Sequence, residues 1–212
     1  MRYIFIFFLI ILLSSCGVKI QTSAIKYAEV PEKISSLVVC RAVGGNLNLN
    51  KRISQLIENE IRIHLDTMIS NEQVTELLQE NNIFYYEDYT DILLKKISNL
   101  TNQRFLIVPT IEAYRESQNI DVQAYLTISY LLYDATDKKA LLVVKSTAKD
   151  SPIKNSNFQS PTDINSKIPL FTKEVVEKIF NYIGISYNKE ATYKRISLEE
   201  YEKNYLPKLK DN

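Results

Sequence analysis

The segment 121–133 alternates between apolar and polar side chains, and this pattern limits the fold more than any other feature of the chain. Its apolar residues fall on one side of an extended strand: Val122, Ala124, Leu126, Ile128, Tyr130 and Leu132. Gln123, Thr127 and Ser129 fall on the other side. Successive side chains of a strand point to opposite faces of its sheet. The segment therefore predicts an antiparallel sheet with one covered face and one face in water.

Other apolar runs predict the strands that complete this sheet, at residues 35–41, 104–114 and 140–148. Residues 67–69 are compatible with a further short strand. Residues 140–148 follow a turn and would pair with 121–133 as a hairpin. Pro109 lies inside the second run, and because proline cannot donate to the ladder it predicts an edge position or a bulge.

Apolar residues at three- and four-residue spacing predict helices over 50–64, 88–100 and 169–183, with 71–78 as a possible fourth. Asn71 and Asp88 are the expected N-caps, and Gly184 the expected stop of the last helix. In the helix 88–100 the expected buried side consists of Ile92, Leu93, Ile97 and Leu100. Together these elements predict an α+β fold (an α/β sandwich) with a mixed, largely antiparallel sheet of about 4–5 strands packed by about three helices.

The order of these elements resembles the domain shared by the curli-secretion lipoprotein, the lipoprotein activators of penicillin-binding proteins and the amino-terminal domain of the Tol-system β-propeller protein. The matching pieces are residues 37–40, 68–78, 105–111 and 131–138, and the likeness covers about residues 35–183. It implies a domain of the cell envelope. Asp137 stands where the family usually has a glycine in the turn, and the long hairpins with which the curli protein builds a pore have no counterpart, so pore formation is not implied.

The first fifteen residues predict an export signal: Arg2 gives a positive start, residues 3–13 are an unbroken apolar run, and two serines follow. The run is about half of the ~20 residues that cross a bilayer as a helix. Residues Leu13, Ser14, Ser15 and Cys16 resemble the lipobox of bacterial lipoproteins. This resemblance implies signal-peptidase recognition of the first three, diacylglycerol on the Cys16 sulfur, and cleavage before Cys16. The alternative is an ordinary secretory signal that ends beside a cysteine.

Two or three acyl chains anchor a protein stably, so the mature chain is expected on a membrane of the cell envelope, at the outer membrane facing the periplasm or at the cell surface. We expect a signal peptide at 1–15, a lipidated N-terminus and tether at 16–34, a single α/β domain at 35–184 and a Tyr/Lys-rich tail at 185–212. Without Arg2, the chain's 26 basic residues fall to 25 against 25 acidic ones. This balance argues against a nucleic-acid partner and predicts no polybasic patch for acidic lipids.

The sequence contains little raw material for catalysis, and we expect no catalytic residue, no metal site and no cofactor. The single histidine, His64, is expected at the boundary of the first helix, and Cys40 as a small buried residue of a strand. Gly44 and Gly45 lack the lysine and further glycines of a phosphate loop. Two acidic groups are expected on solvated helix faces: Glu58, Glu60 and Asp66, and Glu199, Glu200 and Glu202.

Tyrosines and phenylalanines gather at residues 84–89 and in the tail, where they would cover the core or form a contact surface: Tyr187, Tyr193, Tyr201 and Tyr205. The expected function is a lipid-anchored interaction or accessory module without catalytic activity. Its partners would be the membrane, through the lipid on Cys16, and an envelope protein, bound by the sheet edge, the loop 150–167 or the tail. The alternatives are a lipid-anchored hydrolase and an outer-membrane assembly subunit resembling the small lipopolysaccharide-transport lipoprotein.

Overall fold

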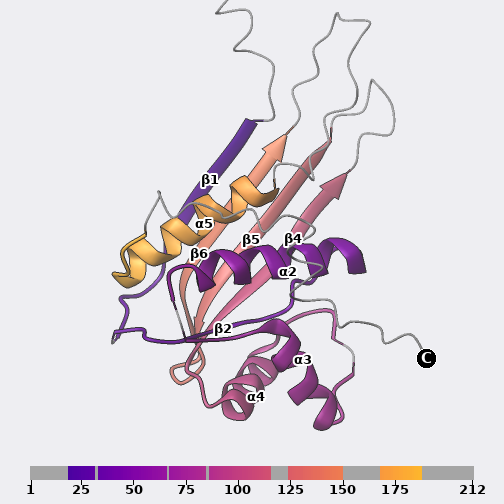
Figure 1. The fold of residues 1–212 in the computed structure, drawn as a ribbon, viewed down its shortest axis with the longest axis vertical. Helices are drawn as coiled ribbons and strands as arrows, with labels where there is room; N and C mark the ends of the chain where they lie inside the picture. Colours follow the sequence, from indigo (N-terminus) through magenta and orange to yellow (C-terminus); the bar gives the residue numbers. More distant parts are fainter. Residues whose placement is uncertain are drawn as a thin grey trace, which may run out of the picture.

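The computed structural model describes residues 19–31, 33–65, 67–84, 86–115, 124–149 and 168–187. Within these ranges the chain forms six strands and four helices (Figure 1). In chain order the elements are β1 (Lys19–Lys26), β2 (Leu37–Val39), α2 (Leu47–Arg62), β3 (Met68–Ile69), α3 (Asn71–Glu80), α4 (Asp91–Thr101), β4 (Phe105–Arg115), β5 (Tyr125–Asp134), β6 (Lys139–Lys149) and α5 (Ile168–Ile183).

The strands form one sheet in the order β1-β6-β5-β4-β2-β3. β1, β6, β5 and β4 are antiparallel to their neighbours, whereas β2 pairs in parallel with both β4 and β3. The expected α+β fold with a mixed, largely antiparallel sheet is confirmed. The sheet has six strands because the short strand expected near residue 68 is present and because β1 adds an unexpected one.

β1 corrects the interpretation of the residues that follow Cys16. Residues 19–26 were expected to belong to a tether, but they pair with β6 over the whole of β1, from Lys19 opposite Lys149 to Lys26 opposite Leu142. Tyr27 continues this contact, since its N–H donates to the carbonyl of Leu141 at 2.9 Å. The tether prediction is therefore wrong for residues 19–26, which are part of the sheet.

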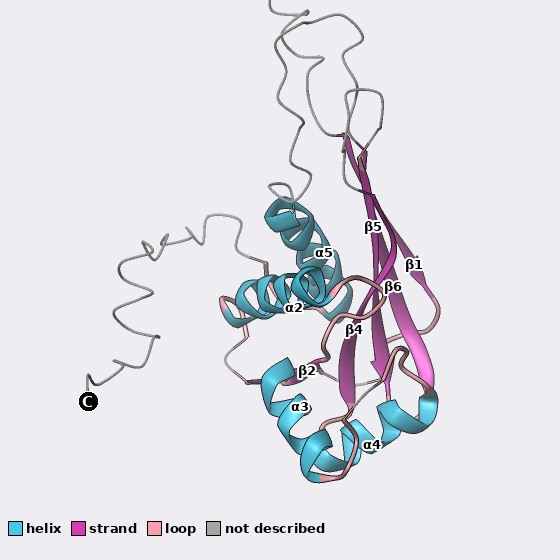
Figure 2. Cartoon of the chain, turned by 90° about the vertical axis from the view of Figure 1, so that its right-hand side faces the viewer, coloured by secondary structure: helices cyan, strands magenta, loops and turns pink. Residues whose placement is uncertain are grey.

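Two groups of helices pack on the sheet, and Figure 2 shows them edge-on. α2 and α5 cover one face and enclose the larger core, where Ile57 of α2 and Val176 of α5 are fully buried with Ile128 of β5. α3 and α4 lie at the β2 end and enclose a smaller core, where Val74 and Ile97 pack with strand residues. Away from the smaller core, which reaches Leu131 and Tyr133 of β5, the other face of β1, β6 and β5 is not covered by any helix of the described residues.

The alternation in β5 is confirmed over its described part. Ala124, Leu126, Ile128, Tyr130 and Leu132 are all buried in the larger core. β4 differs because both of its faces are covered at its start: Ile107 enters the larger core, and Leu106 and Val108 enter the smaller one. Burial on both faces explains why residues 105–108 form a continuous apolar run rather than an alternating one.

Pro109 lies on β4, which is an interior strand, so the edge position predicted for it is wrong. It is tolerated because the pairing with β2 ends at Val39, opposite Ile107. Beyond this point the chain of β2 continues irregularly, and the carbonyl of Pro109 accepts the N–H of Val43 at 3.3 Å. A register shift in β4 does occur, but further on, between Ile111 and Ala113.

The helix starts differ from the predicted ones by one to three residues, and α2 begins at Leu47 rather than at residue 50. Ser70 caps α3 in a capping box with Gln73, so Asn71 is the first helical residue rather than the cap. Thr90 caps α4 in place of Asp88. Ile92 then falls on the outer side of α4 and is 84% exposed, which corrects its assignment to the buried side. Gly184 follows α5 with a φ of 74°, as a C-terminal glycine should.

Candidate functional site

On the sheet face opposite α2 and α5, we call the part that α3 and α4 leave uncovered the open face; it extends over β1, β6, β5 and the later part of β4, and it is mostly polar. Cross-strand neighbours lie in rows, one of which runs from Ser23 through Lys145 to Ser129. Thr127 and Thr147 share a hydrogen bond of 3.3 Å between their hydroxyl groups, and Lys145 forms an ion pair with Glu112. Thr127 and Ser129 thus lie on the water-facing side of the strand as predicted, whereas Gln123 lies outside the described residues.

One row of the open face is apolar and reaches the free edge of the sheet. We call Ile25, Val143 and Leu131 the apolar row, since they are direct cross-strand neighbours. Leu131 packs against the smaller core, and the exposure rises outward to Ile25, which is 56% exposed. Tyr27, just past the end of β1, is 60% exposed. Among the described residues nothing pairs with the outer side of this edge strand, so its backbone groups lie next to exposed apolar side chains.

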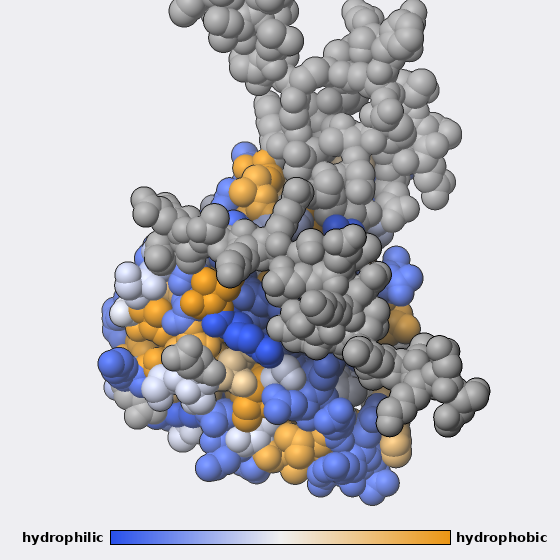
Figure 3. Space-filling model, viewed as in Figure 1, coloured by the Kyte–Doolittle hydropathy of each residue, from blue (hydrophilic) through white to orange (hydrophobic). Residues whose placement is uncertain are grey.

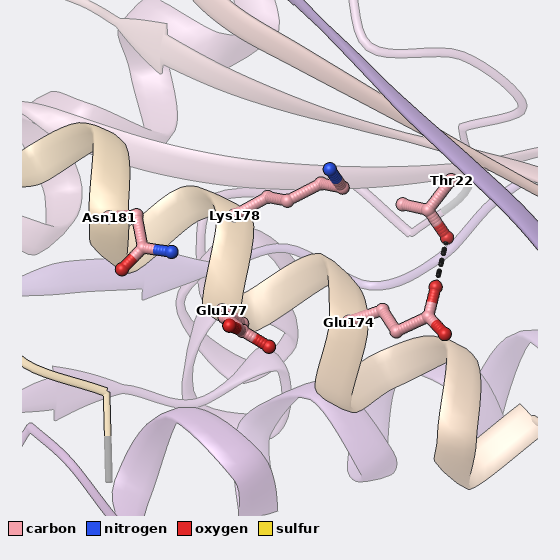
Figure 4. A pocket seen from close by; sticks show the side chains of 5 residues that line it. All are labelled: Thr22, Glu174, Glu177, Lys178 and Asn181. Carbon is pink, nitrogen blue, oxygen red and sulfur yellow. Dashed lines mark hydrogen bonds between the residues drawn. The ribbon is translucent and has the colours of Figure 1, made fainter. Parts of the chain in front are cut away.

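The opposite side of β1 borders a shallow groove of about 310 Å³ that is lined by Thr22, Glu174, Glu177, Lys178 and Asn181 (Figure 4). The Thr22 hydroxyl donates to Glu174 Oε2 at 2.6 Å and lies 3.0 Å from the Ser146 hydroxyl. The groove lies between the edge strand and α5, and its lining includes acidic, basic and uncharged polar side chains. Sequence reasoning missed it because Thr22 was placed in the tether.

Around this groove, the surface over α2 and α5 has apolar areas broken up by polar ones, as the described part of Figure 3 shows. Leu47 at the start of α2 and Leu170 at the start of α5 are exposed singly, at 70% and 49%. Isolated apolar residues of this kind are ordinary on protein surfaces. This face therefore offers less to a partner than the edge at β1 does.

A buried polar cluster joins the end of α2 to the residues after α5. Tyr187 donates to Glu60 Oε1 at 2.5 Å, and its ring lies against the ring of His64, with centroids 4.5 Å apart. Phe180 meets His64 edge-on at 5.6 Å. His64 Nε2 is 3.9 Å from Glu60 Oε1, and both side chains are almost fully buried. Burial lowers the pKa of His64, although the Glu60 carboxylate acts in the opposite direction.

The placement of Glu58 and Glu60 corrects the prediction of a solvated helix face. Glu60 is 3% exposed and Glu58 is 7% exposed. Glu58 Oε1 accepts hydrogen bonds from the backbone N–H and the side-chain amide of Asn71, at the start of α3. Burial raises the pKa of Glu58 in spite of these bonds. His64, expected at the boundary of the first helix, lies two residues after α2 ends. Asp66, Glu199, Glu200 and Glu202 lie outside the described residues.

Cys40 and the two glycines have structural roles. Cys40 is fully buried in the smaller core, as predicted, and burial raises the pKa of its thiol far above the ordinary value. Gly44 has a φ of 88°, and a Cβ atom there would lie 2.3 Å from the Ile111 carbonyl oxygen. Gly45 donates its N–H to Asn50 Oδ1 at 3.0 Å. This loop thus packs closely on β4 and holds the start of α2.

The aromatic segment at 84–89 divides between the two expected roles. The Tyr89 hydroxyl lies 2.8 Å from the carbonyl oxygen of Arg41 and 3.1 Å from the Tyr86 hydroxyl. The Arg41 guanidinium stands over the Tyr86 ring, 4.8 Å from its centroid. These tyrosines cover the smaller core, whereas Phe84 is 70% exposed. Of the tail tyrosines, Tyr187 packs against the larger core, and the other three lie outside the described residues.

The sequence matches no family model and no curated protein. Among solved structures, it is similar to a variant of the PelC dodecamer from Paraburkholderia phytofirmans, with 10% identity, a TM-score of 0.45, and coverage of 80% of this chain and 100% of that chain. Lipoprotein GNA1162 from Neisseria meningitidis has 16% identity and a TM-score of 0.47, over 70% of this chain and 99% of that chain. The LpoB C-terminal domain from Escherichia coli has 16% identity and a TM-score of 0.34, with coverage of 53% of this chain and 81% of that chain. Membership of the lipoprotein group named above stays a prediction.

No group of three or more His, Cys, Asp or Glu side chains that could hold a metal ion occurs within the described ranges. Nor does any helix in this part of the chain have the length and apolar character needed to cross a membrane. The residues predicted for lipidation and signal-peptidase recognition lie outside the described residues: Cys16, Leu13, Ser14 and Ser15. What the described surface offers is an open face, an apolar row and a free strand edge.

Proposed function

We propose that this protein is a lipid-anchored interaction or accessory module of the bacterial cell envelope, without catalytic activity, and that it binds an envelope protein at the β1 edge of its sheet. The observation that carries this proposal is the position of the apolar row. Its most exposed member, Ile25, lies on an edge strand of eight residues whose outer side pairs with no other described strand.

The physical argument concerns what natural proteins do with edge strands. A long edge strand with unpaired backbone groups is a template for pairing, and proteins usually blunt it with lysines, proline, a bulge or a covering element. The lysines of β1 lie only at its two ends, at positions 19 and 26. β1 contains no proline, and its pairing with β6 has no register shift. The other edge of the sheet, β3, is only two residues long. A partner segment added to β1 would gain main-chain hydrogen bonds and could bury Ile25 and Tyr27.

The lipid would decide where this edge operates. In our proposal Cys16 carries the acyl chains, Leu13, Ser14 and Ser15 form the peptidase recognition site, and the domain lies at the outer membrane on its periplasmic side. Two residues separate Cys16 from the start of β1. The binding edge is thus held next to the membrane, where its partner should be another protein of the envelope.

Site-specific photocrosslinking in cells tests the partner site. A photoreactive residue in place of Ile25 should give a discrete crosslinked product, and the same residue in place of Ile92, which is 84% exposed on α4, serves as the matched control. With the photoreactive residue in place of Tyr27, which is 60% exposed beside Ile25, the variant Ile25→Asp should abolish the crosslinked product, whereas Ile92→Asp should not. Crosslinking from position 92 alone, or equal loss in both variants, would contradict the proposal.

Lipidation needs a separate measurement. Incorporation of a labelled fatty-acid analogue should depend on Cys16 and disappear in Cys16→Ser. Unchanged labelling of that variant would contradict the anchor and would leave the crosslinking result to be judged by itself.

A further inference from the structure

The sheet gathers basic residues from distant parts of the chain at one end. Lys19 is opposite Lys149 in the pairing of β1 with β6, Lys149 is opposite Tyr125 in the pairing of β6 with β5, and Tyr125 is opposite Arg115 in the pairing of β5 with β4. These residues thus occupy one row across four strands, at the end of the sheet where β1 begins (Figure 1). We call Lys19, Lys149 and Arg115 the basic row.

Strand alternation places Lys149 and Arg115 on the open face, because their neighbours Ala148 and Tyr114 pack toward the larger core. Both Lys149 and Arg115 are exposed. Among the described residues, the ion pair on this face joins Lys145 to Glu112, nearer the middle of the sheet. Lys149 and Arg115 are therefore accessible at the rim of the sheet.

The row lies close to the cysteine that is expected to carry the lipid. Gly17 and Val18 alone separate Cys16 from Lys19. Three Cα steps of extended chain span roughly 10 Å, which is comparable to the Debye length of about 8 Å at physiological ionic strength. Strands stand about 4.8 Å apart, so the row runs roughly 15 Å across the sheet and could contact several lipid headgroups.

We propose that the basic row rests on the membrane surface and binds the phosphate groups of anionic phospholipids, with Tyr125 at the level of the headgroups. This inference rests on the proposed lipid anchor at Cys16. It departs from the expectation, drawn from balanced net charge, that the chain has no polybasic patch for acidic lipids. The charges balance along the whole sequence, but strand pairing brings three cations from separate segments into one row.

The consequence of this contact is orientation. An acyl anchor by itself leaves the domain free to rotate about its attachment point. A second contact through the basic row would hold the strands pointing away from the membrane and keep the β1 edge available from the side. Each cation that reaches an anionic surface strengthens attachment about fivefold, so the three together would favour this orientation by about a hundredfold.

The experiment uses the mature chain from Cys16 to Asn212, coupled through Cys16 to a maleimide lipid in vesicles. Cys40 is fully buried, so the coupling is selective. The chain has no tryptophan, and Tyr125→Trp therefore introduces a single indole into the row, while Ile92→Trp places one on α4 as the control. The readout is quenching of indole fluorescence by brominated lipids, in phosphatidylcholine vesicles with and without phosphatidylglycerol.

We expect strong quenching at position 125 in vesicles that contain phosphatidylglycerol, weak quenching in phosphatidylcholine alone, and weak quenching at position 92 in both. Adding Lys149→Gln and Arg115→Gln to the Tyr125→Trp protein should lower its quenching to the level seen without phosphatidylglycerol. Circular dichroism melts that match the parent would show that these variants fold. Glu116 directly follows Arg115, and Asp150 directly follows Lys149. Because these two acidic residues lie outside the described residues, the experiment uses the whole mature chain, which contains both.

Equal quenching at both positions, or quenching at position 125 that does not depend on phosphatidylglycerol, would overturn the inference. Because the maleimide lipid replaces biological acylation, such a result would leave the lipidation of Cys16 and the crosslinking from Ile25 unaffected. Fatty-acid labelling that stays unchanged in Cys16→Ser, in turn, would contradict the anchor without changing the vesicle measurement.

Discussion

Arg104 holds Asp134 in a two-pronged contact, with Nε donating to Oδ1 at 2.9 Å and Nη2 donating to Oδ2 at 2.8 Å. Oδ1 also accepts the backbone N–H groups of Thr136 and Asp137. Burial alone would raise the pKa of Asp134, but the bonds from Arg104 and the two N–H groups outweigh it and hold the pKa below its ordinary value. The turn between β5 and β6 is thus built around a buried, charged carboxylate.

Replacing this carboxylate should weaken the whole sheet. Asp134→Ala leaves Arg104 and two backbone donors without their acceptor, and we expect a loss of about 2–4 kcal/mol in the free energy of unfolding. The neighbouring Asp137 also pairs with Arg104, but its side chain is 42% exposed. Asp137→Ala should therefore cost under about 1 kcal/mol. Urea unfolding measures both values, and equal losses would show that the buried contact has no special role.

Gly44 should tolerate no side chain. Gly44→Ala would force a Cβ atom to within 2.3 Å of the Ile111 carbonyl oxygen at a φ of 88°, so the turn between β2 and α2 must shift. We expect a loss of about 2–4 kcal/mol, since overpacking adds to the backbone strain. Gly184→Ala is the matched control, because its φ is 74° and no atom lies within 4 Å. It should cost only about 1 kcal/mol in the same thermal or urea unfolding experiment.

Lys138 offers a stabilising substitution. It has a φ of 52° in the turn between β5 and β6, a conformation that glycine adopts without strain. Lys138→Gly should raise the free energy of unfolding by about 0.5–1 kcal/mol. Asn102, after α4, also has a φ of 52°, but asparagine tolerates this region better than lysine does. Asn102→Gly should therefore raise the free energy of unfolding by less than Lys138→Gly does, as urea unfolding would measure. A larger increase for Asn102→Gly would contradict the strain argument.

The buried histidine should make the protein less stable in acid. His64 has its pKa lowered below 6.5 by burial in the folded state, with Glu60 opposing this. In the unfolded chain the pKa of His64 is about 6.5, and in the folded protein it is lower. At a pH between these two values the unfolded chain binds a proton that the folded protein does not, so the free energy of unfolding falls as the pH drops below about 6.5. His64→Gln should flatten the dependence of the melting temperature on pH between about pH 7 and pH 5.

Glu58 provides the control for that experiment because its sign is opposite. Its pKa is raised from 4.5 by burial, so the folded protein binds a proton before the unfolded chain does, and protonation stabilises the fold as the pH falls. Glu58→Gln should remove this gain and make the loss in acid steeper. An unchanged slope in His64→Gln would show that another group dominates the acid response.

The parts of the fold that could be predicted from the sequence are those with local patterns. The period of two in β5 revealed both its strand and its covered face, and helical spacing revealed α2, α4 and α5. Ile92 was misplaced because α4 begins at Asp91 after the Thr90 cap, and only the position of the sheet decides which side of such a short helix is buried. Boundaries and faces of short elements depend on tertiary packing.

The missed features all depend on partners far away in the chain. β1 has mixed polarity and resembles a linker until β6 is placed beside it. Glu58 and Glu60 look solvated on a helical wheel, but Asn71 and Tyr187 bond to them from other elements. The basic row likewise exists only after four strands have paired. The β1 edge, on which the proposed function rests, was therefore beyond the reach of sequence patterns.

The pairing of β1 with β6 also has a consequence in time. Thr22 and Ser146, which meet across this pair, are 124 residues apart. In a chain that emerges N-terminus first, β1 is present long before β6. The strands β4, β5 and β6 are neighbours in sequence, so each can pair with the one before it as soon as it emerges. Until β1 docks on β6, β6 is the outer strand of the growing sheet and can accept the same segment from a neighbouring chain. Strand exchange between two copies therefore competes with closure of one, most strongly where the copies are crowded together.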